Sequence, residues 1–301
     1  MALSAGYSMK MINDDATRTD ATVPETRTVV DADGVTIYYY VWSASAPKAV
    51  IHLNHGVGEH ARRYAALAKD LNAAGYTVVG HDQRGHGQTG INHLGVGKLG
   101  ERSIRAATDA AQFVGERIRE ENPDLPLVLL AHSWGSFMGQ KIINRSTLYD
   151  AVVLSGSSLA VPGVTATKNF NRKWKTATAT GMEWLSRDES VWAAFAADEF
   201  NFDVSAKPAW TPMQAFVLLG RPPKTMPRDI PMLIQGGSDD PLGGTRGLTL
   251  LHKAYLKRAK LSDVTLRIYP GARHEIYNET NRDEIIGDLV RWLDAHTGSQ
   301  R

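Results

Sequence analysis

One serine stands in surroundings that could make it a nucleophile. The stretch AHSWGS places Ser133 between small residues, with Ala131 two positions before it and Gly135 two positions after it. The apolar run that ends at Ala131 predicts a strand, and the residues after Ser133 can begin a helix at once. Such a strand–serine–helix turn exposes the hydroxyl beside the amino end of a helix, which favours developing negative charge. Taken alone, the string also fits a serine that merely fills a turn.

A serine hydroxyl needs a base, and the base needs a carboxylate that orients it. Two late loops offer these groups. LIQGGSDDPLGG follows one apolar run and carries Asp240, and RIYPGARHEIYNE follows the next and carries His274. Asp239 is a rival for the acid, but Asp240 stands directly before Pro241. The order Ser, Asp, His, each on a loop after a strand, predicts Ser133 as nucleophile, His274 as base and Asp240 as acid.

An ester or amide carbonyl under attack develops negative charge on oxygen, which two N–H donors must stabilise. The residue after the nucleophile, Trp134, supplies one backbone N–H. The second is expected from a loop after an early strand, and LNHGVGEHARRY carries the glycines that such a loop requires. We expect Val57 to be that donor, with a glycine-rich turn that only packs as the alternative.

The elements that must position these residues follow an α/β pattern. Alternating residues around 27–42, joined across Asp33-Gly34, predict a β-hairpin. Near-continuous apolar runs, typical of strands buried on both faces of a parallel sheet, stand at 49–54, 76–81, 127–131, 151–155, 231–236 and 264–269. Helical periodicity fills the gaps between them. The sequence predicts a mostly parallel sheet of roughly eight strands with helices on both faces.

One long segment interrupts this alternation. Residues 157–228 show no strand pattern, so we expect a helical cap inserted into a core of 25–156 and 229–301. The cap holds nine of the fourteen Trp and Phe residues of the chain. They could form the core of the cap or line an apolar substrate tunnel. The candidate substrate-binding residues are Phe170, Trp174, Trp184, Trp192, Phe195 and Phe216.

Composition narrows the classes of function. A net charge of +2 gives no case for a nucleic-acid partner, and the absence of cysteine excludes disulfides and a thiolate nucleophile. Residues 1–24 lack the apolar run of a signal peptide or membrane span, so we expect a mobile arm and a cytoplasmic protein. His55, His60, His81, Asp82 and His86 fit no established metal-ligand spacing, and turn residues bonded to backbone are expected instead. No cofactor or metal is expected.

Five ordered motifs carry a resemblance to a known family. NHGVGEHARRY, GHDQRGHGQTG, AHSWGS, GGSDDPLGG and YPGARHEIYNE resemble the monoacylglycerol lipase and lysophospholipase branch of the α/β-hydrolases. WLSRDESVWAAFAADEF in the cap resembles another family segment. The resemblance covers residue 27 to the C-terminus and implies the same triad, the same two oxyanion donors and a cap over an acyl tunnel. This sequence departs from the family pattern at Thr89, Ala131 and Trp134, and we expect the Trp134 indole to reshape the pocket.

The resemblance implies a serine hydrolase that cleaves carboxylic esters of monoacylglycerol or lysophospholipid type. SWGS is also similar to proline iminopeptidases, so an amidase or aminopeptidase with the same triad is an alternative. A non-catalytic ligand-binding receptor on this fold is a further alternative, though such proteins usually lack part of the triad. The expected partner is a small acyl ester, and the cap is the candidate for transient contact with a lipid surface. Oligomeric state, headgroup and acyl length are left open.

Overall fold

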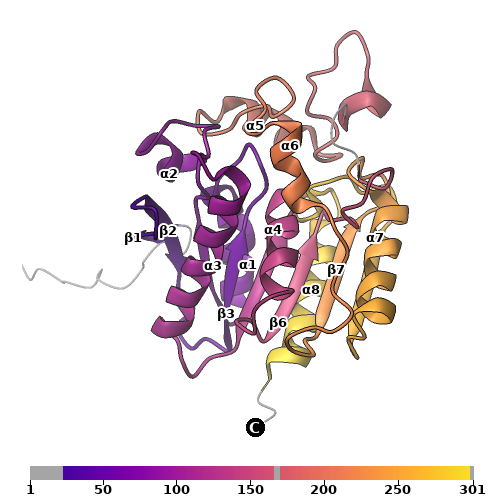
Figure 1. The fold of residues 1–301 in the computed structure, drawn as a ribbon. Coiled ribbons are helices and arrows are strands. Elements are labelled where there is room, and N and C mark those ends of the chain that lie inside the picture. Colours follow the sequence, from indigo (N-terminus) through magenta and orange to yellow (C-terminus); the bar gives the residue numbers. More distant parts are fainter. Residues whose placement is uncertain (1–22, 166–169, 299–301) are drawn as a thin grey trace, which may run out of the picture.

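A twisted sheet of eight strands forms the centre of the protein (Figure 1). The computed structural model describes residues 23–165 and 170–298, so the expected N-terminal arm lies outside the described residues except for its last two. The strands lie in the order β1-β2-β4-β3-β5-β6-β7-β8. Their bounds are Glu25–Val30 (β1), Thr36–Trp42 (β2), Ala49–Asn54 (β3), Tyr76–His81 (β4), Leu127–His132 (β5), Ala151–Ser155 (β6), Met232–Gly237 (β7) and Val264–Tyr269 (β8).

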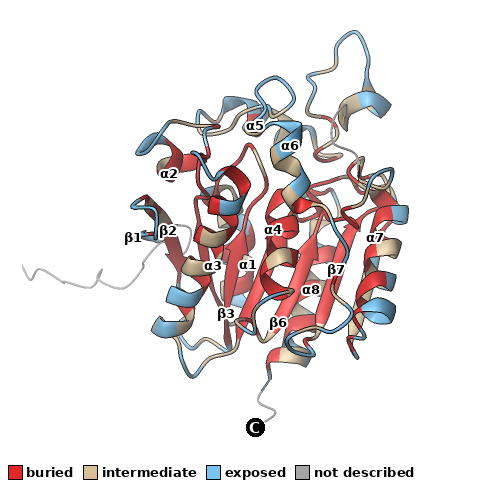
Figure 2. Cartoon of the chain, in the orientation of Figure 1, coloured by how far each residue is buried: buried red, intermediate tan, exposed pale blue. Residues whose placement is uncertain are grey.

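The pairing confirms the predicted α/β-hydrolase sheet. β2 runs antiparallel to both β1 and β4, whereas every pair from β4 to β8 is parallel. β1 and β2 form the expected hairpin, and Gly34 in its turn has φ +77°, a conformation that glycine adopts without strain. The strands from β3 to β7 are buried along their whole length because helices cover both faces (Figure 2).

Two helical layers enclose the sheet. On one face α3 (Ser103–Glu121), α4 (Trp134–Ile143) and α7 (Gly244–Lys253) share an apolar cluster with the strands. On the other face α1 (Ala65–Ala73) and α8 (Arg282–Thr297) do the same. Alternate residues of one strand belong to opposite layers, as Val50 and Ile51 do. Shorter elements are η1 (Ala61–Tyr64), α2 (Gly87–Ile91), the π-helical turn η4 (Ala254–Arg258) and η5 (Ile276–Asn278).

The segment between β6 and β7 lies above the sheet in the view of Figure 1. It contains η2 (Phe170–Trp174), α5 (Glu189–Ala197), α6 (Pro212–Ala215) and η3 (Phe216–Leu218), and no strand among its described residues. Its longest helix, α5, has nine residues, so this segment is more irregular than the helical cap that the sequence led us to expect. Prolines at 208, 212, 222, 223 and 227 limit helix length there. No helix in the described ranges is both long and apolar enough to cross a bilayer.

Candidate active site

Ser133 occupies a sharp turn between β5 and α4. Its backbone has φ 52° and ψ −123°, a conformation that is strained for any residue except glycine. The turn brings the start of α4 against the end of β3. A Cβ on Gly135 would lie 2.5 Å from the carbonyl oxygen of Asn54, so only glycine fits at that flank. The strand–serine–helix junction predicted from AHSWGS is therefore present, with the serine in its strained corner.

His274 and Asp240 form a buried pair on the neighbouring loops. His274 Nδ1–H donates to Asp240 Oδ2 at 2.9 Å, and the other carboxylate oxygen accepts the backbone N–H of Leu242 at 2.8 Å. Because Nδ1 carries the proton, Nε2 keeps its lone pair and can act as a base. The rival acid Asp239 instead forms an exposed ion pair with Lys173 at 2.6 Å. The geometry therefore favours Asp240 as the partner of His274.

One pocket brings the serine and the histidine together. Ser133, His274, Gly56 and Val57 all line it. The pocket has about 370 Å³ of space free of atoms, part of it open to solvent. Gly156, with φ +52°, lets the backbone approach His132 and His274: a Cβ there would lie 2.7 Å from His132 Cε1 and 3.1 Å from His274 Cε1.

The two expected oxyanion donors lie beside this pocket. Trp134 is the first residue of α4, so its N–H has no acceptor within the helix. In the described ranges no hydrogen bond uses the backbone N–H of Val57 or that of Trp134. The His55–Gly56 peptide, one before the peptide that carries the Val57 N–H, is held by Glu59, whose Oε1 accepts the N–H of Gly56 at 2.6 Å. Both expected donors therefore have no acceptor among the described residues, and Val57 lines the same pocket as Ser133.

The electrostatics of His274 suit a general base. Burial disfavours the charged imidazolium, but the Asp240 carboxylate outweighs burial and raises the pKa of His274 above its ordinary value. His132, next to Ser133, packs on His274 with ring centroids 4.7 Å apart. Burial and the neighbouring His274 hold the pKa of His132 well below its usual range, so His132 stays neutral. A neutral neighbour adds no second positive charge beside the base.

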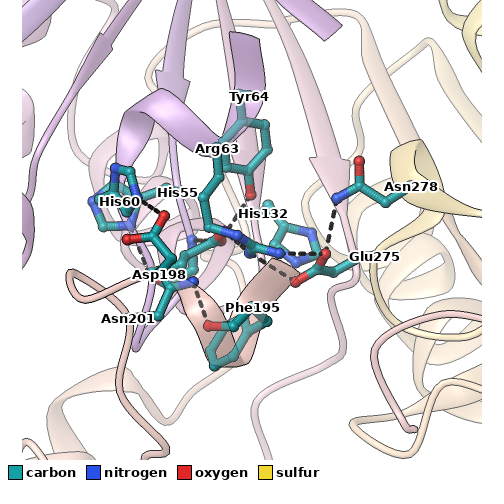
Figure 3. A network of polar contacts seen from close by, with 12 residues as sticks. His55, His60, Arg63, Tyr64, His132, Phe195, Asp198, Asn201, Glu275 and Asn278 are labelled. Atoms are coloured by element: carbon teal, nitrogen blue, oxygen red, sulfur yellow. Dashed lines mark hydrogen bonds and ion pairs between the residues drawn. The ribbon is translucent and has the colours of Figure 1, made fainter. Parts of the chain in front are cut away.

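A buried ionic cluster that sequence patterns did not indicate supports the wall of the pocket (Figure 3). Arg63 donates to Glu59 at 2.5 Å and holds Glu275 through two bonds of 2.9 and 3.0 Å. Tyr64 also donates to Glu59, at 2.8 Å. Burial raises the pKa of Glu59, whereas Arg63 outweighs burial at Glu275 and lowers its pKa. The spacing of Glu59 and Arg63 fits a helix surface pair, but their partner Glu275 is over 200 residues away, so no local signal indicated the cluster.

The six aromatic candidates of the cap divide into four groups. Trp184 and Phe195 line the pocket, and Trp184 packs on His274 with ring centroids 4.8 Å apart. Phe170 stacks behind Trp184 at 4.8 Å. Trp174 and Trp192 do not line the pocket and instead contact the guanidinium of Arg273. Contrary to the expectation, Phe216 does not line the pocket, and its side chain on η3 is 66% exposed.

The Trp134 indole does not reshape the pocket, contrary to the sequence expectation. It is buried under the cap, where it stacks on Trp210 with centroids 5.1 Å apart and packs with Phe137 and Leu218. Its Nε1–H has no hydrogen-bond partner among the described residues. Phe202, which sequence patterns did not single out, lines the pocket instead.

The histidine-rich front half forms structural contacts. His55 and His86 donate from Nδ1 to the backbone oxygens of Gly56 and Arg84 at 2.7 and 2.9 Å. His60 pairs with Asp198 of the cap at 2.8 Å. Within the described part of the chain no three His, Asp or Glu side chains are grouped as metal ligands would be.

Comparison with known proteins shows the family to which this chain belongs. The family described as "Serine aminopeptidase, S33" matches residues 45–281. A monoacylglycerol lipase of Mycolicibacterium smegmatis is 32% identical over 278 residues, which cover 87% of this chain and 94% of that protein. The chain belongs to the monoacylglycerol lipase branch of the α/β-hydrolases. Membership in this branch makes the protein a carboxylic ester hydrolase.

Other relatives agree on the branch and the fold. A monoglyceride lipase of Mus musculus is 30% identical over 284 residues, 88% of this chain and 89% of that protein. A carboxyl esterase of Bacillus coagulans, solved with glycerol, superposes with a TM-score of 0.75 at 20% identity, covering 91% of this chain and 99% of its own. A soluble variant of monoglyceride lipase from Saccharomyces cerevisiae gives 0.74 at 21% identity, covering 94% and 98%. These two structures bear on the fold alone.

Proposed function

We propose that this hydrolase cleaves the ester bond of monoacylglycerols through a Ser133–His274–Asp240 triad and an acyl-enzyme. The observation that carries the proposal is the pairing of His274 Nδ1–H with buried Asp240, in the pocket that also holds the strained Ser133. This arrangement leaves Nε2 of the histidine as the proton acceptor for a serine hydroxyl.

The reaction proceeds in two halves. Ser133 Oγ attacks the ester carbonyl carbon while His274 Nε2 takes the hydroxyl proton, and the N–H groups of Val57 and Trp134 stabilise the oxyanion. The oxyanion collapses, the bond to the alcohol breaks, and His274 returns the proton to the leaving alcohol oxygen. Water then attacks the acyl-enzyme with His274 again as base, and the carboxylic acid leaves with Ser133 restored. Asp240 keeps the imidazole in the required tautomer throughout.

The charge of the pocket favours a neutral headgroup. Its lining includes the carboxylates of Glu59, Asp203 and Glu275, and none of the described residues that line it is a lysine or arginine. Arg63 pairs with Glu59 and Glu275, so a phosphate group would meet the unpaired Asp203 carboxylate and no free lysine or arginine in the lining, whereas a glycerol hydroxyl can donate to Asp203. This supports monoacylglycerol over lysophospholipid among the esters that the family resemblance allows.

The cap supplies the apolar wall. Trp184, Phe195 and Phe202 line the pocket from the cap side and favour acyl chains over acetate. We also assign transient contact with a lipid surface to the outer cap, where Met213 and Phe216 are 81% and 66% exposed.

An aminopeptidase would need free acidic groups for the amino group of its substrate. Glu59 and Glu275 both bind Arg63, so of the three carboxylates in the described pocket lining only Asp203 lacks an ion-pair partner. The aminopeptidase alternative therefore rests on that one carboxylate, and the experiment below tests both reactions.

The deciding experiment compares wild type with Ser133→Ala on monoacylglycerols, lysophosphatidylcholines and aminoacyl anilides, with a fluorophosphonate probe as active-site label. We expect wild type to prefer monoacylglycerols of medium or long chain, and Ser133→Ala to keep its fold while losing both turnover and labelling. Near-wild-type activity in that variant would refute the triad, and a preference for anilides would refute the ester assignment. A folded wild type that neither turns over nor labels would indicate a receptor.

A further inference from the structure

The loop that carries His274 is hydrogen-bonded to the cap along its backbone. The N–H of His274 donates to the carbonyl of Trp184 at 3.3 Å, and that of Glu275 donates to Leu185 at 2.7 Å. Ser186 extends the contact, because its hydroxyl donates to the carbonyl of Asn278 at 2.8 Å. The cap residues 184–186 therefore lie beside the histidine loop and are joined to it by three hydrogen bonds.

Glu279 joins the two segments at one buried carboxylate. Its side chain is fully buried, and both oxygens accept hydrogen bonds. Oε1 accepts the backbone N–H of Arg273 at 2.7 Å and that of Arg187 at 3.3 Å. Oε2 accepts Arg187 Nε at 2.7 Å and the N–H of Thr280 at 3.1 Å. Arg273 directly precedes His274, so this carboxylate fixes the Ala272–Arg273 peptide, one residue before the proposed base.

The side chain of Arg273 also joins the histidine loop to the cap. Its Nη1 donates to the cap carbonyls of Glu183 and Ser186 at 2.5 and 2.8 Å. Its guanidinium lies 4.5 Å from the ring centre of Trp174. Arg187 is further anchored to Asn281, with a bond of 2.6 Å from Nη2. The mechanism proposed above uses none of Arg187, Arg273 and Glu279.

We infer that Glu279 is a positioning residue for His274, acting through the backbone of Arg273 and the cap residue Arg187. The buried carboxylate accepts the hydrogen bonds of four N–H groups that water would otherwise solvate. It thereby holds these four groups in one fixed arrangement. Movement of the 273–275 backbone would turn the imidazole away from Ser133 while Asp240 stayed in place. The cap segment at 184–187 is thus part of the support of the proposed base.

This inference rests on the proposed role of His274, and its test separates the two. Glu279→Gln keeps the shape of the side chain but replaces one accepting oxygen with an amide NH₂ group. We expect kcat on a monoacylglycerol to fall about 10- to 100-fold with KM changed less than about twofold, because a small misplacement of the base affects the chemical step. The low-field proton resonance of the His274–Asp240 hydrogen bond should shift or broaden, a signal that a purely structural role would leave unchanged.

Arg187→Gln and Arg187→Lys complete the series, since this side chain is one-third exposed and its loss is less disruptive to folding. We expect Arg187→Gln to lower kcat in the same way and Arg187→Lys to restore part of it. The matched control is Arg119→Gln, which breaks a similarly half-buried pair with Asp150 at the start of β5. It should lower thermal stability and leave kcat unchanged.

A Glu279→Gln protein with kcat within about twofold of wild type and an unchanged low-field resonance would overturn the inference. If Glu279→Gln does not fold, Arg187→Gln is judged by the same two measurements. If wild type hydrolyses no ester, the proposed function fails, but the resonance still decides the role of Glu279: a shifted signal supports it and an unchanged one overturns it.

Discussion

Gly139 of α4 lies directly against Ala131 of β5. A Cβ on Gly139 would be 3.2 Å from the Cβ of Ala131 and 3.0 Å from Leu129 Cδ2. The helix therefore provides, one turn after Gly135, the space that the Ala131 methyl group occupies. This explains how the strand and helix approach closely without the glycine that usually stands two residues before the serine.

The two flanks of Ser133 should respond differently to exchange of a single methyl group. Gly135→Ala places a Cβ against the backbone oxygens of Asn54 and His55, which cannot move away. We expect a loss of about 1–3 kcal/mol in the free energy of unfolding and a clear fall in kcat/KM. Ala131→Gly should keep its activity and lose about 0.5–1 kcal/mol. Urea unfolding and ester kinetics measure both, and equal effects at the two positions would contradict this account.

The pH dependence should reflect the raised pKa of His274. The base must be neutral to accept the serine proton, so kcat/KM should be level at high pH and fall as pH drops through that pKa. Because the pKa is raised, the acid limb should have its midpoint above the ordinary 6.5. Asp240→Asn removes the carboxylate that raises it, so its limb should move to lower pH with a rate about 10⁴-fold smaller. A wild-type midpoint well below 6.5 would contradict the assignment.

Glu59 should matter for both stability and rate. Glu59→Gln weakens the contacts with Arg63, Tyr64 and the N–H of Gly56 in a buried site. We expect a cost of about 1–3 kcal/mol in unfolding free energy. The His55–Gly56 peptide, one before that of Val57, is also released, so kcat should fall by about tenfold or more. The exposed Glu120→Gln serves as the control, and an unchanged kcat in a destabilised Glu59→Gln would limit the cluster to folding.

The outer cap should bind lipid without taking part in the chemistry. Replacing Met213 and Phe216 together by serine removes two exposed apolar side chains far from the pocket. Each contributes at most about 1.5–3 kcal/mol when buried, so vesicle partitioning should weaken by about tenfold or more. Hydrolysis of a short dissolved ester should be unaffected. Cosedimentation with neutral vesicles measures the first effect, and undiminished partitioning would place the contact elsewhere.

Trp134→Met tests whether the indole acts on substrate or only on packing. The indole fills space under the cap and stacks on Trp210, so its loss should cost about 1–3 kcal/mol in unfolding free energy. The acyl-chain preference should stay that of wild type, because the indole lies outside the pocket lining. A chain-length panel on the variant checks this, and a shifted optimum would restore the sequence expectation.

The sequence predicted the fold because its signals were local. Each parallel strand stands out as a short apolar run, and the loops that follow carry Ser133, Asp240 and His274 in an order that a parallel sheet brings to one edge. Their catalytic roles stay predictions that the variants above test.

Side-chain direction in the cap was beyond sequence reasoning. Periodicity gives the facing of a residue only within a regular helix or strand, and most of the cap is irregular. Phe216 was therefore assigned to the pocket while Phe202 was missed. The Glu59–Arg63–Glu275 cluster and the hydrogen bonds of Glu279 join residues from loops that are far apart in the sequence. No rule of residue spacing connects such loops.

The cap contacts both the loop of the proposed base His274 and the loop of the proposed oxyanion donor Val57. These two contacts affect how the protein can be redesigned. Residues 184–187 bind the histidine loop, while the N–H of Phe202 donates to Gly58 beside Val57 at 2.9 Å. A cap transplanted from a relative to change substrate choice would carry only its own half of each contact. Chimaeras should therefore exchange residues 58–63 and 273–281 together with the cap, and the evolutionary history of these three segments should be shared.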